Sequence, residues 1–309
     1  MAPIDMSAAR SLLRRIPSLL LAAAFVALQA FAAQAQSGST PLIWEVRSAT
    51  NTVYLFGTIH VGARKMYPLS PAVERAYAAS RIVVLEADPT DQSAAITAMQ
   101  RAAYKPPDNL VNHVSPALME DLNKALPSIG LAIEYAQAMP PHLLAMMLVM
   151  LEVGRQGYDP SLGLEMHLAR RAKQDGKRIV ELESIAGQLA LFDSFSPDLQ
   201  EGMLRATVDG ITTNALGSEV RELVAAWSAG DAKRMTEQLD KEMESLPAAQ
   251  AQEMRERLYD ARNREMSERI AAMLAGGEPT FVAVGAGHLL GPTGILELLR
   301  AKGYAIRRM

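Results

Sequence analysis

Short apolar runs lie near the two ends of this chain, whereas longer amphipathic stretches fill its middle. Runs of this length, rich in Val, Ile and Phe and bounded by polar or glycine residues, are typical of buried β-strands. The spacing predicts strands at residues 42–46, 53–57, 81–85, 177–182, 280–284 and 304–306.

The first half of the pattern predicts a hairpin followed by a parallel unit. Residues 48–52 are polar and turn-like, so the first two strands should pair through them. A helix is expected over residues 70–79, where Ser70-Pro71 provides an N-cap and a proline at the first helical position. A strand, a helix and a further strand in this order are typical of a parallel sheet.

Helical patterns dominate the stretches at about 91–175 and 185–276. Within the first, residues 142–153 are apolar nearly all round, which indicates a buried helix or a lid. We therefore predict an α/β fold whose mixed, mainly parallel sheet is formed from both ends of the chain, with a large helical insertion. The core strands should lie at about 42–88, 177–184 and 280–309, in a single domain spanning 36–309.

The N-terminus has the pattern of a secretory signal peptide. Arg10, Arg14 and Arg15 precede an apolar stretch from Leu19 to Ala33, and Ala33-Gln34-Ala35 fits a cleavage site. We expect residues 1–35 to be removed, leaving a periplasmic or secreted chain that begins at Gln36 and has no stable membrane span. The alternative is an uncleaved anchor, since residues 16–33 could almost cross a bilayer.

Composition excludes several kinds of chemistry. The net charge is −3, and it stays negative without the basic leader, so no nucleic-acid partner is expected. The 309 residues contain no cysteine, which rules out thiolate catalysis and thiolate metal sites. The chain has no Gly-x-Ser-x-Gly, and its glycines at 285, 287 and 291 lack the downstream unit that a dinucleotide site requires.

Two copies of one motif carry the most functional information. An apolar run enters Gly57-Thr58-Ile59-His60 near the N-terminus, and a second enters Gly285-Ala286-Gly287-His288 near the C-terminus. Ligands of α/β sheets bind outside the carboxyl ends of the strands, so His60 and His288 should meet over one site. Neutral imidazole is a common metal ligand and a general base near neutral pH. For either histidine alone, a hydrogen-bonded loop residue would be the simpler interpretation.

Two glutamates end strands in the same way. Glu86 follows the strand at 82–85, and Glu183 follows the strand at 179–182. In parallel strands both carboxylates would reach the edge that holds the histidines; otherwise they are loop residues facing water. Two histidines with one or two carboxylates suit zinc, manganese, iron or cobalt without choosing between them.

Arg262 and Glu165 are charged residues on apolar helix faces. Arg262 falls within the stripe of Leu258 and Met266, where it needs an acidic partner or an anionic ligand, or else extends along the edge of the core. Glu165 has Leu162 and Leu168 as helical neighbours. A buried Glu165 would pair with Arg262 or act as a base with a raised pKa.

The chain resembles the TraB/GumN family, also called TraB/PrgY, which is related to the TIKI metalloproteases. The resemblance covers nearly all of the chain after the leader, and the matching segments are 55–62, 84–86, 163–165, 182–184, 261–263, 284–289 and 291–304. It implies an α/β core shared with erythromycin-esterase-like and haem-binding ChaN-like proteins. From the TIKI branch it implies divalent-metal-dependent peptide cleavage. The implied metal ligands are His60, Glu86 and His288, and the implied catalytic residues are Glu165, Glu183, Arg262 and Asn263.

These observations predict an exported metal-dependent hydrolase acting on peptide or amide bonds, or on a small-molecule substrate, with Mn, Co or Zn as cofactor. Three alternatives stay open. A histidine could serve as the general base of a metal-free esterase. The chain could instead be a binding protein that sequesters a peptide, haem or metal. The GumN name alone suggests an accessory role in exopolysaccharide export.

Overall fold

The computed structural model describes residues 40–309, which form one compact unit. The expected signal peptide at 1–35 and its cleavage site lie outside the described residues. Within the described part, no helix is both long and apolar enough to cross a membrane.

A six-stranded mixed sheet has the strand order β4-β3-β5-β2-β1-β6. The strands are β1 (Ile43–Arg47), β2 (Thr52–Thr58), β3 (Ile82–Leu85), β4 (Arg178–Glu181), β5 (Thr280–Gly285) and β6 (Ala305–Arg308). Strands β4, β3, β5 and β2 run parallel, whereas β1 is antiparallel to both β2 and β6. The predicted α/β class, the hairpin and the contribution of both chain ends to one sheet are therefore confirmed.

Burial explains the apolar runs in the centre of the sheet. All four side chains of β3 are buried, as are the apolar side chains of β5. Parallel strands are covered on both faces, so their sequences are nearly continuously apolar rather than alternating. The edge strands are less buried: β6 alternates between exposed and partly buried residues, and β4 has two partly buried residues between exposed ends.

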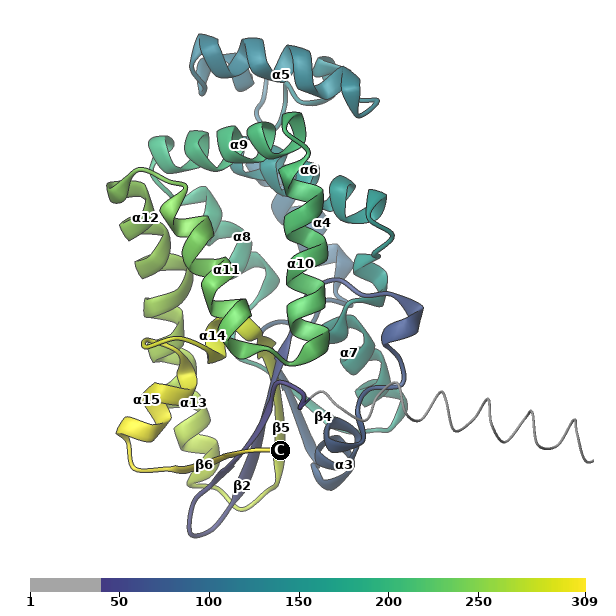
Figure 1. The fold of residues 1–309 in the computed structure, drawn as a ribbon, viewed down its shortest axis with the longest axis vertical. Coiled ribbons are helices and arrows are strands. Elements are labelled where there is room, and N and C mark those ends of the chain that lie inside the picture. Colours follow the sequence, from purple (N-terminus) through teal and green to yellow (C-terminus); the bar gives the residue numbers. More distant parts are fainter. Residues whose placement is uncertain (1–39) are drawn as a thin grey trace, which may run out of the picture. The chain divides into compact units, whose positions relative to one another are not determined.

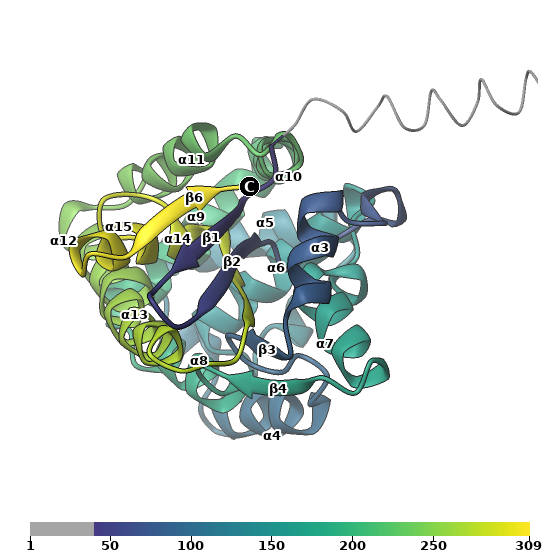
Figure 2. The same ribbon diagram turned by 90° about the horizontal axis from the view of Figure 1, so that it is seen from below.

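Helices cover the two faces of the sheet, as Figure 2 shows from below. These helices are α3 (Pro71–Ala79) and α7 (Leu164–Gln174) on one side, and α13 (Ala261–Leu274) and α15 (Ile295–Ala301) on the other. Ser70 caps α3 through Val73 N–H, with Pro71 following it, as predicted. Each predicted helical stretch therefore ends in a helix that lies on the sheet. The stretch at 91–175 ends in α7, and the stretch at 185–276 ends in α13.

The remaining helices stand over the carboxyl ends of the parallel strands (Figure 1). They are α4 (Gln92–Ala102), α5 (Pro116–Ser128), α6 (Pro141–Arg155), α8 (Ile185–Asp193), α9 (Pro197–Thr212), α10 (Ala215–Ala229), α11 (Ala232–Glu244), α12 (Ala248–Met254) and α14 (Ala286–Leu289). Helices α5, α6 and α9 enclose a second apolar core that contains Leu118, Leu144 and Leu204. The α6 helix is only partly buried, because Met150 and Leu151 remain exposed.

Two local features were not predicted from the sequence. Within the expected helical stretch at 185–276, a π-helical segment, Arg255–Asp260, separates α12 from α13. Directly after β5 the chain forms the short helix α14. As a result, His288 lies in a helix that starts at the strand end.

Candidate functional site

The carboxyl ends of the four parallel strands bring the predicted residues together. Thr58 at the end of β2 pairs with Gly285 of β5, and Leu85 at the end of β3 pairs with Ala283 of β5 and Glu181 of β4. The residues that follow these ends include His60, Glu86, Glu183 and His288. The expectation that both motifs reach one sheet edge is therefore met.

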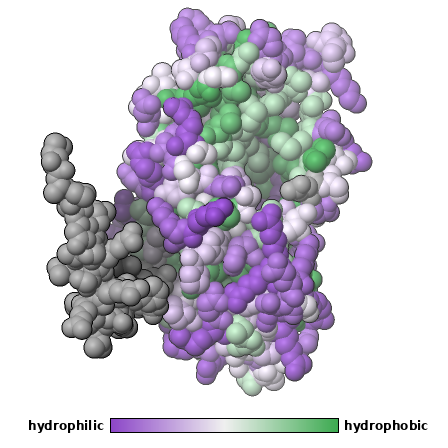
Figure 3. Space-filling view, turned by 90° about the vertical axis from the view of Figure 1, so that its right-hand side faces the viewer, coloured by the Kyte–Doolittle hydropathy of each residue, from purple (hydrophilic) through white to green (hydrophobic). Residues whose placement is uncertain are grey.

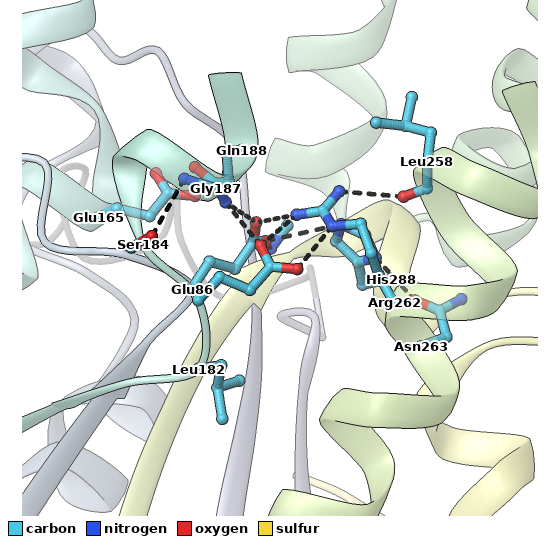
Figure 4. Close-up of polar contacts among 12 residues, drawn as sticks. Glu86, Glu165, Leu182, Ser184, Gly187, Gln188, Leu258, Arg262, Asn263 and His288 are labelled. Atoms are coloured by element: carbon cyan, nitrogen blue, oxygen red, sulfur yellow. Dashed lines mark hydrogen bonds and ion pairs between the residues drawn. The ribbon is translucent and has the colours of Figure 1, made fainter. Parts of the chain in front are cut away.

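Glu86 lies at the centre of a polar network (Figure 4). One of its oxygens, Oε1, accepts the backbone N–H of Gly285 at 2.6 Å, and Oε2 accepts bonds from Arg262 and Gln188, each at 3.1 Å. Burial alone would raise the pKa of Glu86, but His60, Arg262 and the backbone N–H of Gly285 hold it below its ordinary value. Glu86 is therefore an ionised carboxylate in the core.

Arg262 bridges the two strand-end glutamates. Its Nε and Nη2 donate to the two oxygens of Glu183, both at 2.7 Å, and Nη2 also reaches Glu86. Its Nη1 donates to the carbonyl of Leu258 at 3.0 Å. Arg262 therefore has acidic partners and does not simply extend along the edge of the core. Its planar guanidinium suits contact with both oxygens of one carboxylate.

His288 is buried and oriented by Asn263. Its Nδ1 lies 2.7 Å from Asn263 Oδ1, while the amide nitrogen of Asn263 donates to the carbonyl of Thr293 at 3.1 Å. Because Asn263 thereby presents its oxygen to the ring, Nδ1 carries the proton and Nε2 keeps its lone pair. Burial lowers the pKa of His288 to about 4, so the ring is neutral at pH 7.

His60 is oriented by Glu165. Its Nδ1 lies 3.1 Å from Glu165 Oε1, which also accepts the hydroxyl of Thr58 at 2.5 Å. Glu165 raises the pKa of His60 to about 9. The His60 side chain is 70% exposed, although it follows a central strand. The carboxyl edge is therefore open to solvent at this point.

The predicted environment of Glu165 was wrong in two respects. Its partner is His60, whereas Arg262 is held by Glu86 and Glu183. Burial would raise the pKa of Glu165, but the contact with His60 lowers it below its ordinary value. Glu165 is therefore an ionised carboxylate that orients His60.

The bare Cα of Gly285 leaves a space that both histidines and Glu86 face. A Cβ atom built at Gly285 would lie 3.2 Å from Glu86 Oε1, 3.7 Å from His288 Cδ2 and 4.0 Å from His60 Nε2. Gly285, three residues before His288, therefore has a steric role here, because a side chain would fill the point on which these groups converge.

The donor set around Gly285 fits a divalent metal in its chemistry. His288 Nε2 and Glu86 Oε1 are 3.9 Å apart, somewhat wider than the roughly 3.4 Å between two ligands of a tetrahedral zinc ion. The hydrogen bonds that the two Nδ1 atoms donate to Glu165 and Asn263 are typical of metal-binding histidines. Among residues 40–309, however, no three His, Asp or Glu side chains are gathered closely enough to hold an ion as they stand.

Three residues of the network were not predicted from the sequence. Gln188 donates to Glu86 and to Glu183, the latter at 2.9 Å, and Thr58 donates to Glu165. The ring of Tyr259 lies 5.5 Å from that of His288. Tyr259 precedes Arg262 and Asn263 by one helical turn, and Gln188 is one turn beyond the cap residue Ser184, so helical spacing could have indicated both.

The remaining histidines lie elsewhere. His142 is buried and bonds Gln200 Oε1 through Nδ1 at 2.9 Å, and His113 contacts Asp108. His167 packs against Tyr67, with ring centroids 4.3 Å apart. Only His60 and His288 therefore join the strand-end network within the described part of the chain.

The strand-end histidines and carboxylates thus define an α/β protein with a buried polar site, and the sequence places it in a known group. The profile of the TraB/PrgY/gumN family matches residues 42–308, so the chain belongs to this family. It is 24% identical over 247 residues to the protein YbaP of Escherichia coli K12, covering 80% of this chain and 87% of YbaP. No solved structure matches the chain.

Two further relatives extend the comparison. A protein of Treponema pallidum is 22% identical over 270 residues, which cover 84% of this chain and 80% of the relative. The metalloprotease TIKI2 of Danio rerio is 26% identical over 303 residues, covering 82% of this chain and 57% of TIKI2. The match to TIKI2 therefore concerns little more than half of that protein.

Proposed function

We propose that this chain is an exported, metal-dependent hydrolase that cleaves peptide or amide bonds. The observation that carries the proposal is the convergence at Gly285, where His60 Nε2, His288 and Glu86 Oε1 surround one space. The distant similarity to a metalloprotease supports the same reaction class. The leader pattern at residues 1–35 supports export to the periplasm or the medium.

His60, His288 and Glu86 would hold the ion, for which Mn, Co and Zn are the candidates. A divalent metal in such a site lowers the pKa of a bound water and so supplies a nucleophile. Glu165 holds His60 through Nδ1, and Asn263 holds His288 through Nδ1, so neither Nε2 atom is engaged by these partners. Because the pKa of His60 is about 9, the ion would replace the proton that Nε2 of His60 carries at pH 7.

Arg262 and Glu183 would act on the substrate: Arg262 by stabilising negative charge, and Glu183 by transferring a proton. The guanidinium contacts both Glu86 and Glu183 and offsets part of their negative charge. A cation held at this place also favours negative charge on a reacting carbonyl oxygen. Glu183, which is less buried than Glu86, is the carboxylate that we assign to proton transfer.

The proposal is tested by metal content and hydrolysis together. We expect close to one equivalent of metal by elemental mass spectrometry in the wild-type protein, and its loss in His60→Ala/His288→Ala. Hydrolysis of a fluorogenic peptide library should be lost in parallel and restored in the wild type when metal is added after chelation. His113→Ala, which alters a histidine outside the network, is the control. Wild-type hydrolysis by the double variant would contradict the proposal.

A metal-free hydrolase is the second candidate, because the His60–Glu165–Thr58 contacts already form a histidine–carboxylate pair with Nε2 exposed to solvent. His60 would act as the general base in its deprotonated form, and because Glu165 raises its pKa to about 9, this activity should increase with pH up to that range. Hydrolysis that persists in EDTA and is lost in His60→Ala would select this candidate. Ligand binding without any product would select the binding-protein alternative.

A further inference from the structure

Two helices form a wall that rises from the candidate site. Helix α4 begins shortly after Glu86, and α8 begins two residues after Glu183. The two helices pack against each other. The side chain of Gln188 in the first turns of α8 bonds Glu86 and Glu183, so the base of this wall is part of the site.

Helix α6 forms a second wall. At its first turn, the ring of His142 stacks on Phe192 near the end of α8, and the chain after α4 joins the segment before α6 through Tyr104 N–H and the carbonyl of Ala138. After its last turn the chain returns to the sheet edge, where Asp159 pairs with Gly62 close to His60. The two walls therefore meet at the start of α6 and the end of α8, away from the sheet. Their opposite ends lie beside the candidate site.

Large apolar side chains on these walls remain exposed. On α4, Ile96 is 55% and Met99 is 49% exposed, and their spacing of three residues places them on one helix face. On α6, Met150 is 40% and Leu151 is 41% exposed. Figure 3 shows a hollow with mostly hydrophobic walls in the upper half of the molecule, among the helices that stand over the sheet. Contiguous apolar surface of this kind marks a binding site.

We propose that this hollow binds an apolar segment of a polypeptide substrate, and that it delivers the adjoining bond to the strand-end site. The inference rests on the proposed hydrolase function. A polypeptide substrate is inferred as the occupant because α8, which forms part of the wall, also contacts Glu86 and Glu183 of the candidate site. The surface is concave, which suits an inserted chain better than the flat contact of a second copy. Methionine side chains adapt their shape, so segments of different apolar sequence should fit.

Binding is measured without turnover, so that it does not depend on the hydrolase proposal. The probe is a fluorescein-labelled twelve-residue peptide of alternating Leu and Phe flanked by lysines, titrated into the full chain carrying His60→Ala/His288→Ala and followed by anisotropy. A peptide of equal length and charge with Ser and Gln in place of Leu and Phe is the matched probe. We expect the apolar peptide to bind at least about tenfold more tightly.

The same titration is repeated with Ile96→Ser/Met99→Ser and with Met150→Ser/Leu151→Ser. Each pair should raise the Kd for the apolar peptide about tenfold. Val111→Ser is the control, because Val111 is 51% exposed and lies on neither wall. Equal affinity for both peptides, or unchanged affinity in both paired variants, would overturn the inference. So would binding to phosphatidylcholine vesicles in place of the peptide, or a dimer that the wall variants dissociate.

If the apolar peptide binds as expected and the wild-type protein still cleaves none of the library peptides, the hollow is supported and the hydrolase proposal fails. If cleavage is observed but the wall variants bind and cleave like the wild type, the hydrolase proposal stands and the hollow is not a substrate site. The two proposals therefore fail separately.

Discussion

The guanidinium of Arg262 stabilises the site through its charge. Its partners Glu86 and Glu183 are largely buried, and it contacts both. In Arg262→Met the two carboxylates lose their counter-charge, so we expect a loss of about 3–5 kcal/mol in the free energy of unfolding. Urea unfolding at pH 7 measures it. Arg264→Met is the control, because Arg264 pairs with Glu256 on the exposed side of the same helix. Equal midpoints for the two variants would contradict the prediction.

The grouping of the candidate residues at one sheet edge was predictable from the sequence, whereas their pairing was not. Strand ends placed His60, Glu86, Glu183 and His288 at one edge, because parallel strands share their direction. The partner of Glu165 depends on how α7 is positioned on the sheet, and no local pattern contains that information. A carboxylate on an apolar helix face predicts only that a partner exists.

The packing of α7 against the end of β2 depends on a glycine. A Cβ at Gly163 would lie 2.4 Å from the carbonyl oxygen of His60 and 3.0 Å from that of Pro160. The backbone of Gly163 is already in a conformation that alanine adopts, with φ at −58°. The cost of Gly163→Ala is therefore steric, and we expect about 1–3 kcal/mol of destabilisation in urea.

A matched substitution separates this steric effect from the general effect of removing a glycine. Gly277 has no atom within 4 Å of its would-be Cβ, so Gly277→Ala should leave the unfolding midpoint close to that of the wild type. If Gly163→Ala unfolds at the same urea concentration as Gly277→Ala, α7 is free to move away from His60 and the prediction is wrong.

At the level of elements, strands were easier to predict than interruptions of helices. The apolar runs, the hairpin turn and the Ser70-Pro71 cap are local signals, and the structure confirms them. The π-helical segment at Arg255–Asp260 has no such signal. It precedes Arg262 and Asn263, so an unbroken α-helix from α12 would carry both residues on a different face. We therefore attribute the π-helical segment to the tertiary contacts that Arg262 and Asn263 make at the site, rather than to helix propensity.

The whole described chain contains two apolar cores. One surrounds the sheet and includes Leu55, and the other lies among α5, α6 and α9 and includes Leu118. The sequence predicted helical insertions within one domain but could not show how they pack, because amphipathic helices fit many arrangements. Residues 40–309 form one compact unit, which favours a single cooperative unfolding transition.

The two tryptophans make that prediction measurable. Trp44 lies in β1, and the indole N–H of Trp227 donates to the carbonyl of Gly57 at 2.8 Å, so fluorescence reports on the sheet, whereas far-ultraviolet circular dichroism reports mainly on the helices. Leu118→Ala should cost about 2–5 kcal/mol and shift both signals to the same lower urea concentration, as should Leu55→Ala. If Leu118→Ala shifts the dichroism and leaves the fluorescence transition in place, the helical part unfolds separately and the single-domain prediction for residues 36–309 is wrong.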